Sequence, residues 1–259
     1  RTRSLDDCQR DRFFWPMTSS TADGPSPLSV LCSGGAVPQM CGPHLWRLPV
    51  ASRVGPDDVS IVSLTTRALP APERPLSSRE LFELSQLYSF AELRDGVPPE
   101  SAGRRAELTR RAEVLLQREA AVAAALENWE NSGLWTMTVS SVGYPRHLQE
   151  RLGPSAPAVL HGFGDSERLH TLGLGVAGSR AAVQRDIDRA KAVGVQAAEH
   201  DLALVAGAAR GVDAAAMDSA IGAGGCAVGV LAESLVKAVS RSETRRHILD
   251  GSLVLVSPL

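Results

Sequence analysis

Short apolar runs alternate with amphipathic stretches through the second half of the chain, and glycine turns separate them. Residues 172–176 and 202–206 are two of these runs, each of a length that suits one strand. Between them, apolar side chains of residues 183–197 recur at helical spacing, with most charged side chains on the other face. A second glycine turn and an alanine-rich stretch follow. This order predicts strand, turn, helix, strand, turn, helix, which is the unit of a parallel α/β sheet.

The same alternation continues on both sides of this unit. Further strands are expected at residues 134–139, 158–161, 227–231 and 253–256, and further helices at residues 146–151 and 241–250. The predicted fold class is therefore α/β, a Rossmann-like parallel sheet with flanking helices, in a domain of residues 133–259.

A small helical region, residues 77–132, is predicted to precede the sheet. Ser77 and Glu80 have the spacing of a capping box, which starts a helix that extends to about residue 90. A longer helix is expected from about residue 101 to residue 131. We expect its apolar stripe to dock against the first helix or the sheet, and a coiled coil with a partner is the alternative.

Charged side chains at the start of the longer helix alternate in sign. Glutamates are interleaved with Arg104, Arg105, Arg110 and Arg111. This pattern indicates a solvated face with ion pairs rather than a DNA-binding stripe.

Residues 1–76 are rich in Pro, Ser, Gly and Arg and show no sustained period. We predict an irregular or disordered segment, in which the apolar patch at residues 59–64 is a candidate for an isolated strand. Residues 1–70 are accordingly expected to be dispensable for the fold.

Two glycine turns, residues 178–180 and 207–213, follow the two central strands, and each carries an arginine. The carboxyl ends of neighbouring parallel strands lie at the same edge of a sheet, where ligands of open α/β sheets bind. Backbone N–H groups, a hydroxyl and guanidinium groups at helix starts suit a phosphate. The candidate phosphate-binding residues in these turns are Gly178, Ser179, Arg180, Gly207, Arg210, Gly211 and Asp213.

Other roles are open for some of these residues. Glycines at strand ends commonly serve turn geometry and close packing, which is our interpretation of Gly173, Gly175 and Gly222. Asp213 lies in the first turn of a predicted helix, where a carboxylate is as suited to a cap or a dipole partner as to a ligand contact.

Three signatures in order resemble the DprA (Smf) family of DNA-processing proteins. The first is Gly178-Ser179-Arg180, the second is Ala206-Gly207 with residues 209–216, and the third is residues 223–225 before the strand at 227–231. The family reads GSR, then SG-ARGID-AAH, then AGG and a strand. The resemblance covers roughly residues 133–259.

This resemblance implies a binding function without catalysis. A family member holds single-stranded DNA by its backbone and passes it to a RecA-type recombinase in natural transformation or recombination, with no cofactor and as a possible homodimer. It also implies that Gly224 and Gly225 join the DNA- or phosphate-binding residues.

The chain departs from the family pattern at several positions. Ala206 stands where the family has Ser, Met217 stands where it has His, and no Tyr-Pro pair follows residue 231. The family continues beyond the position of Leu259, so the chain resembles a member cut short. We therefore expect an open sheet edge and an uncovered apolar face, and hence aggregation or binding of a partner.

An enzyme of the same superfamily is the alternative function. LOG-type phosphoribohydrolases cradle a nucleotide phosphate with similar turns, but their PGGxGTxxE segment has no match here. A nicotinamide-dependent dehydrogenase is disfavoured because GxGxxG is not formed.

The overall composition adds limits to this picture. A formal net charge of −2 gives no global field for nucleic acid, so a DNA site has to be a local basic patch. The four cysteines show no CxxC spacing, which gives no support for a metal site. No apolar run has the length of a membrane span, and a cytoplasmic protein is expected.

Overall fold

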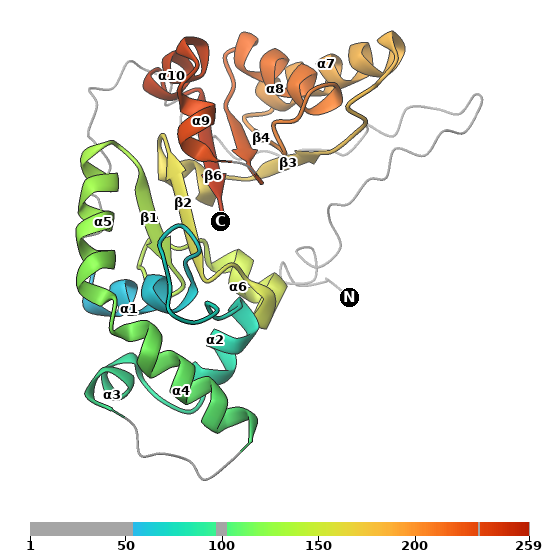
Figure 1. Cartoon of the computed structure of the whole chain (residues 1–259). Helices are drawn as coiled ribbons and strands as arrows, with labels where there is room; N and C mark the ends of the chain where they lie inside the picture. The colour runs from blue at the N-terminus through green and yellow to red at the C-terminus, as the bar shows by residue number, and fades with distance from the viewer. Residues whose placement is uncertain (1–53, 97–102, 233, 259) are drawn as a thin grey trace, which may run out of the picture. The chain divides into compact units, whose positions relative to one another are not determined.

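Six strands form one mixed sheet in the computed structural model, which describes residues 54–96, 103–232 and 234–258. The strands are β1 (Trp135–Thr138), β2 (Val159–Phe163), β3 (Gly173–Val176), β4 (Ala203–Ala206), β5 (Ala227–Val230) and β6 (Leu253–Ser257). Their order across the sheet is β1-β2-β6-β5-β4-β3. Figure 1 labels all of these strands except β5. β3, β4, β5 and β6 are parallel, whereas β2 is antiparallel to both β1 and β6. The α/β, Rossmann-like fold class is confirmed, but the sheet is mixed rather than parallel because β2 runs opposite to the other five strands.

β6 is buried on both faces near the middle of the sheet. Because successive side chains of a strand point to opposite faces, its residues contribute to two different cores. Leu253 and Leu255 pack in the core that contains helices α7 and α8. Val254 and Val256 pack on the other face with Leu160 of β2. This near-continuous apolar run is typical of a central parallel strand.

Helices α7 (Gln184–Glu199) and α8 (Val212–Gly222) connect β3 to β4 and β4 to β5. They lie side by side in Figure 1 and pack very closely. A Cβ atom on Gly194 of α7 would lie 2.2 Å from the carbonyl oxygen of Ala216 on α8. Glycine and alanine at this contact therefore permit the two helices to approach each other.

The other α-helices precede the sheet or lie beside its remaining strands. They are α1 (Pro56–Thr65), α2 (Ser78–Ser85), α3 (Phe90–Asp95), α4 (Arg104–Leu116), α5 (Glu119–Asn131), α6 (Arg146–Leu152), α9 (Leu235–Val239) and α10 (Ser242–Leu249). The expected longer helix is two helices, α4 and α5, with a break at residues 117–118. Its apolar stripe docks in a core with α1 and α2, as predicted.

α1 corrects the predicted strand at residues 59–64 and the irregular segment there. Pro56 occupies the start of this helix, and the Asp58 carboxylate accepts a hydrogen bond from the Gly55 N–H at 2.8 Å. Ile61, Val62 and Leu64 have no exposed surface. Five consecutive residues of the helix, 60–64, are buried, including two serines, so it shows no amphipathic period that a sequence pattern could detect. Residues 1–53 lie outside the described residues, and the division at 76/77 and 132/133 stays a prediction.

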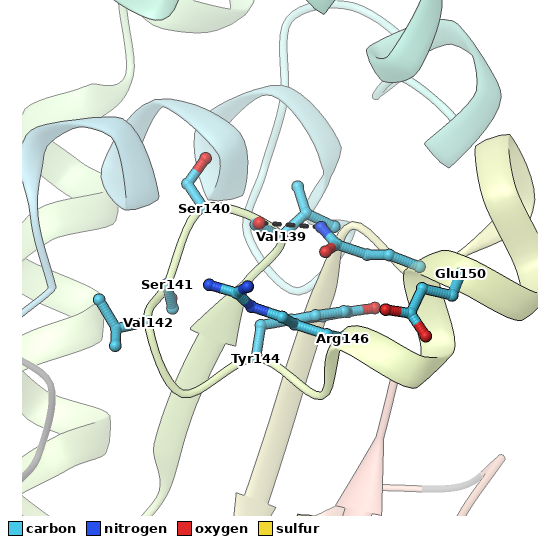
Figure 2. A pocket seen from close by; sticks show the side chains of 8 residues that line it. Val139, Ser140, Ser141, Val142, Tyr144, Arg146 and Glu150 are labelled. Carbon is cyan, nitrogen blue, oxygen red and sulfur yellow. Dashed lines mark hydrogen bonds between the residues drawn. The ribbon is translucent and has the colours of Figure 1, made fainter. Parts of the chain in front are cut away.

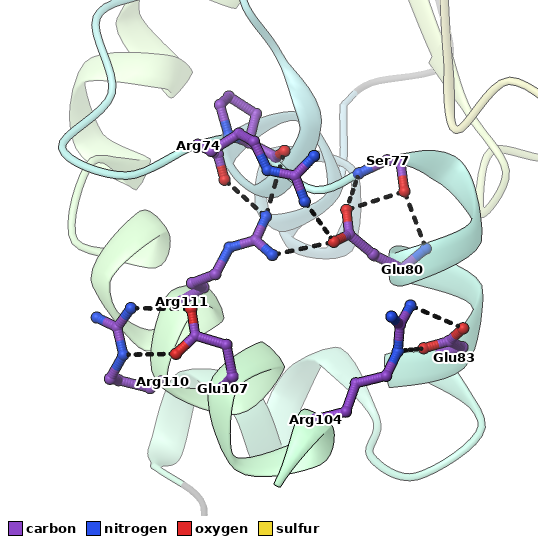
Figure 3. Close-up of polar contacts among 9 residues, drawn as sticks. Arg74, Ser77, Glu80, Glu83, Arg104, Glu107, Arg110 and Arg111 are labelled. Atoms are coloured by element: carbon purple, nitrogen blue, oxygen red, sulfur yellow. Dashed lines mark hydrogen bonds and ion pairs between the residues drawn. The ribbon is translucent and has the colours of Figure 1, made fainter.

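Glu80 is the centre of a polar cluster between α2 and α4 (Figure 3). Its carboxylate accepts hydrogen bonds from the Ser77 N–H at 2.8 Å and from the Arg111 guanidinium at 3.0 Å. Arg111 is 6% exposed, so it does not belong to the solvated face predicted for it. Arg104 and Arg110 do form exposed ion pairs, with Glu83 and Glu107.

Burial alone would raise the pKa of Glu80. The hydrogen bonds from Ser77 and Arg111 outweigh it and lower the pKa from 4.5 to about 2. The carboxylate therefore stabilises the folded chain fully above pH 4.5, and this contribution is lost as the pH falls toward 2.

Replacement Glu80→Gln should remove that part of the pH dependence. We expect the free energy of unfolding of the variant to change less between pH 5 and pH 2 than that of the unsubstituted chain, roughly in proportion to the lost pKa shift. Urea unfolding at several pH values measures this. Glu113→Gln is the control, because this exposed glutamate has no ion pair within the described residues. Equal pH profiles for the Glu80 variant and the unsubstituted chain would contradict the assignment.

Replacement Ile61→Ala tests the contribution of α1 to the fold. Loss of this fully buried side chain should lower the free energy of unfolding by about 2–5 kcal/mol, because a cavity forms in the helical core. Val236→Ala is the control, since that side chain is 67% exposed. A loss as small as that of the control would support the prediction that residues 1–70 are dispensable.

Candidate nucleic-acid interface

The two predicted glycine turns lie at adjacent positions on one edge of the sheet. Val176, the last residue of β3, is paired with Ala206, the last residue of β4. Gly178 and Gly207 follow these residues by two and by one, so both turns begin at the carboxyl ends of neighbouring parallel strands. This is the arrangement that the sequence predicts.

Asp213, in the first turn of α8, joins the two turns. Its Oδ1 accepts a hydrogen bond from the Gly178 N–H at 3.2 Å, and its Oδ2 accepts one from the Gly207 N–H at 3.1 Å. The side chain is buried, with 6% of the residue exposed. Both carboxylate oxygens and both amides are thus used within the protein. Asp213 is a positioning residue, and these contacts give no support to the predicted contact of Asp213 with a phosphate.

Backbone contacts hold the turns together as well. The Val212 N–H donates to the Ser179 carbonyl oxygen at 3.2 Å. Gly211 has a φ of +87°, and a Cβ atom there would lie 2.2 Å from the Ser179 carbonyl oxygen. A Cβ atom on Gly178 would lie 2.6 Å from Val212. These two glycines therefore allow one turn to pack directly on the other.

Arg180 and Arg210 are exposed beside this contact. Within the described residues, neither guanidinium forms an ion pair or a hydrogen bond with another side chain. Ser179 is also exposed, and its Oγ accepts a hydrogen bond from the Ala181 N–H at 3.1 Å. Its O–H can still donate to another acceptor. Two unpaired cations and a hydroxyl on touching turns can bind an anion such as a phosphate.

Gly224 and Gly225 do not join this group. α8 runs from the carboxyl edge of the sheet to the opposite edge, and these glycines precede β5 there. Gly224 ends the helix with a φ of +84°, and its N–H donates to the Ile221 carbonyl oxygen. A Cβ atom on Gly225 would lie 2.6 Å from that of Ala198 on α7. In the structure they serve a helix end and close packing, and their predicted phosphate role gains no support from the geometry of the turns.

Sequence reasoning missed Ala208 in the second turn. Its φ of +52° lies in the left-handed region, which alanine rarely adopts. Alanine, unlike glycine, gives no indication of a positive φ in the sequence. The positioning role of Asp213 could be predicted, because a carboxylate in the first turn of a helix commonly accepts hydrogen bonds from nearby backbone N–H groups.

The fold and the two turns define a Rossmann-like α/β domain with a basic edge. Residues 135–258 match the family described as DNA recombination-mediator protein A (DprA), and the domain that they form is similar to this family. A search among curated proteins found no match.

Two solved structures are similar to the chain. DNA processing protein A (DprA) from Streptococcus pneumoniae is 21% identical with a TM-score of 0.53; the match covers 71% of this chain and 63% of that one. DNA processing protein A from Helicobacter pylori, solved for its single-stranded DNA binding mode, is 20% identical with a TM-score of 0.38; the match covers 48% of this chain and 55% of that one. The chain thus spans less than two thirds of either protein. The pneumococcal structure shows a shared fold.

Within the described residues, no helix is long and apolar enough to cross a membrane.

Replacement Asp213→Asn tests the link between the turns. An amide group can accept only through its oxygen, so at least one of the two backbone hydrogen bonds is lost. We expect faster amide hydrogen exchange at Gly178, Gly207 or both, by about tenfold for each lost bond of ordinary strength. Asp218→Asn, on an exposed residue of the same helix, is the control. Unchanged exchange at both glycines would contradict the link.

Proposed function

We propose that this chain binds single-stranded DNA by its phosphate backbone at the turns after β3 and β4. The observation that carries the proposal is the pair of exposed, unpaired guanidiniums of Arg180 and Arg210 on two turns that touch each other. The match of residues 135–258 to a family of DNA recombination mediators supports this choice of ligand.

Binding of this kind does not depend on base sequence. Phosphate contacts fix the position of a strand and carry no sequence information, and they weaken as salt is added. The formal net charge of −2 contributes no long-range attraction, so the affinity depends on the local cations. Ser179 can add one hydroxyl donor to the same phosphate path.

We infer in addition that the bound strand is passed to a RecA-type recombinase and that the chain itself performs no catalysis, as the family resemblance implies. A homodimer would place two such edges on one assembly. These partners rest on the family, and the DNA contact rests on the geometry of the turns.

Replacements Arg180→Ala and Arg210→Ala should each weaken binding to every single-stranded sequence tested. Each should also flatten the slope of log affinity against log salt concentration by about 0.7, because one phosphate contact is lost. Fluorescence anisotropy with labelled oligonucleotides at several salt concentrations measures both effects. Arg104→Ala is the matched control, since it removes the same charge from an exposed ion pair on α4.

Two results would contradict the proposal. One is a salt slope that the turn variants leave unchanged relative to the Arg104 variant. The other is release of free base from AMP by the unsubstituted chain without salt-sensitive DNA binding, which would favour the phosphoribohydrolase alternative.

A further inference from the structure

A polar cavity lies at the end of β1, away from the glycine turns. It has a volume of about 360 Å³ and is formed by the loop after β1 and the start of α6 (Figure 2). Its wall includes apolar side chains, from Val139 and Val142, and two oppositely charged ones, from Arg146 and Glu150. The function proposed above uses none of these residues.

The cavity opens at the same edge of the sheet as the turns. β1 is antiparallel to β2, and β2 is antiparallel to β6, so β1 runs in the same direction as β6, β5, β4 and β3. The loop after β1 therefore follows a carboxyl strand end, as both glycine turns do. Since adjacent strands lie about 4.8 Å apart, β1 is roughly 20–25 Å along this edge from β3 and β4, which a strand of several nucleotides can span.

Hydrogen bonds hold the loop in a fixed conformation. Asp58 Oδ1 accepts from the Thr138 hydroxyl at 2.5 Å and from the Ser141 hydroxyl at 2.8 Å. The Tyr144 hydroxyl donates to the Pro157 carbonyl oxygen at 2.7 Å, and the Gln149 side-chain amide donates to the Val139 carbonyl oxygen at 3.0 Å. A loop that is already held in place loses little backbone entropy when a ligand binds.

Arg146 and Glu150 are one helical turn apart but form no ion pair with each other or with another described residue. Figure 2 shows the Arg146 guanidinium directed toward the segment that carries Ser140 and Ser141, while the Glu150 carboxylate lies on the opposite side. Both side chains are exposed, and Val142, at the rim, is 95% exposed. The cavity thus offers a set of donors, a separate acceptor and an apolar wall.

This combination matches a guanine base better than a phosphate. A phosphate would be repelled by Glu150 and would leave most of the volume empty. Guanine presents acceptors at O6 and N7, which suit a bidentate arginine, and it presents N–H donors at N1 and N2, which suit a carboxylate. Its flat face can pack on the valine side chains. Cytosine offers one donor fewer to the carboxylate.

We propose that this cavity binds one guanine base of the single strand whose backbone lies at the glycine turns. The inference rests on the proposed function for the strand and adds a base preference to it. Arg146 donates to O6 and N7, and Glu150 accepts from N1–H and the N2 amino group.

Oligo(dT) in which guanine replaces one thymine tests the preference. The unsubstituted chain should bind it about tenfold more tightly than oligo(dT) alone, within the range of one good bidentate contact. Arg146→Ala and Glu150→Gln should abolish this difference and keep the affinity for oligo(dT). Arg151→Ala is the control for charge, because this exposed residue of α6 does not line the cavity, and it should keep the preference.

The outcomes separate the two proposals. Equal affinity for oligomers with any of the four bases, or a preference for cytosine, would overturn the guanine site and leave the phosphate site intact. If no single strand binds at all, the proposed function fails, and titration with dGMP then decides the cavity by amide chemical shifts. Shifts at Ser140 and Val142 that disappear in Arg146→Ala would support the guanine site, and their absence would overturn it.

Discussion

The carboxylate of Asp213 is the interaction on which the candidate DNA site depends. It accepts one hydrogen bond from each glycine turn, from Gly178 and from Gly207, although the turns are separated by a helix and a strand in the sequence. A buried carboxylate with two backbone donors is well satisfied, whereas its loss would leave two amides without their partner. The relative position of Arg180 and Arg210 follows from this bond pattern.

Close packing behind the turns supports the same geometry. α7 and α8 approach each other through small residues, such as Gly194 and Ala216, and both cover the face of the sheet that Leu253 and Leu255 share. The helical region is joined to the other end of the sheet, where Asp58 of α1 binds the loop after β1. Asp213 thus fixes the glycine turns, and Asp58 fixes the loop after β1. Both candidate sites lie on the same sheet.

Much of the sheet domain could be predicted from the sequence. The alternation of short apolar runs with helical periods predicts all six strands near their observed positions, and glycine spacing predicts that the two turns meet. α1 could not be predicted, because its five consecutive buried residues, 60–64, leave no polar face there to set a helical period. The phosphate role of Gly224 and Gly225 follows from the family motif alone, although their position before the strand at 227–231 puts them at its amino end, away from the two turns.

The helix break before α5 and the cavity after β1 depend on contacts between distant residues. Arg118 lies at this break, and its guanidinium donates hydrogen bonds to the carbonyl oxygens of Ser63, Thr66 and Leu69. These bonds tie the break to the end of α1 and to the segment that follows it. No local pattern encodes such a contact, since its acceptors are backbone atoms. In the same way, the order of the loop after β1 requires Asp58, some eighty residues earlier in the sequence.

The affinity of the Asp213→Asn variant for single-stranded DNA tests the account most directly. Removal of a negative charge would by itself strengthen the attraction of the protein for DNA. If Asp213 positions the two arginines, the opposite must occur: the folded variant should bind single strands several-fold more weakly and with a flatter salt dependence. Equal or tighter binding by a folded Asp213→Asn variant, with both arginines present, would contradict the account.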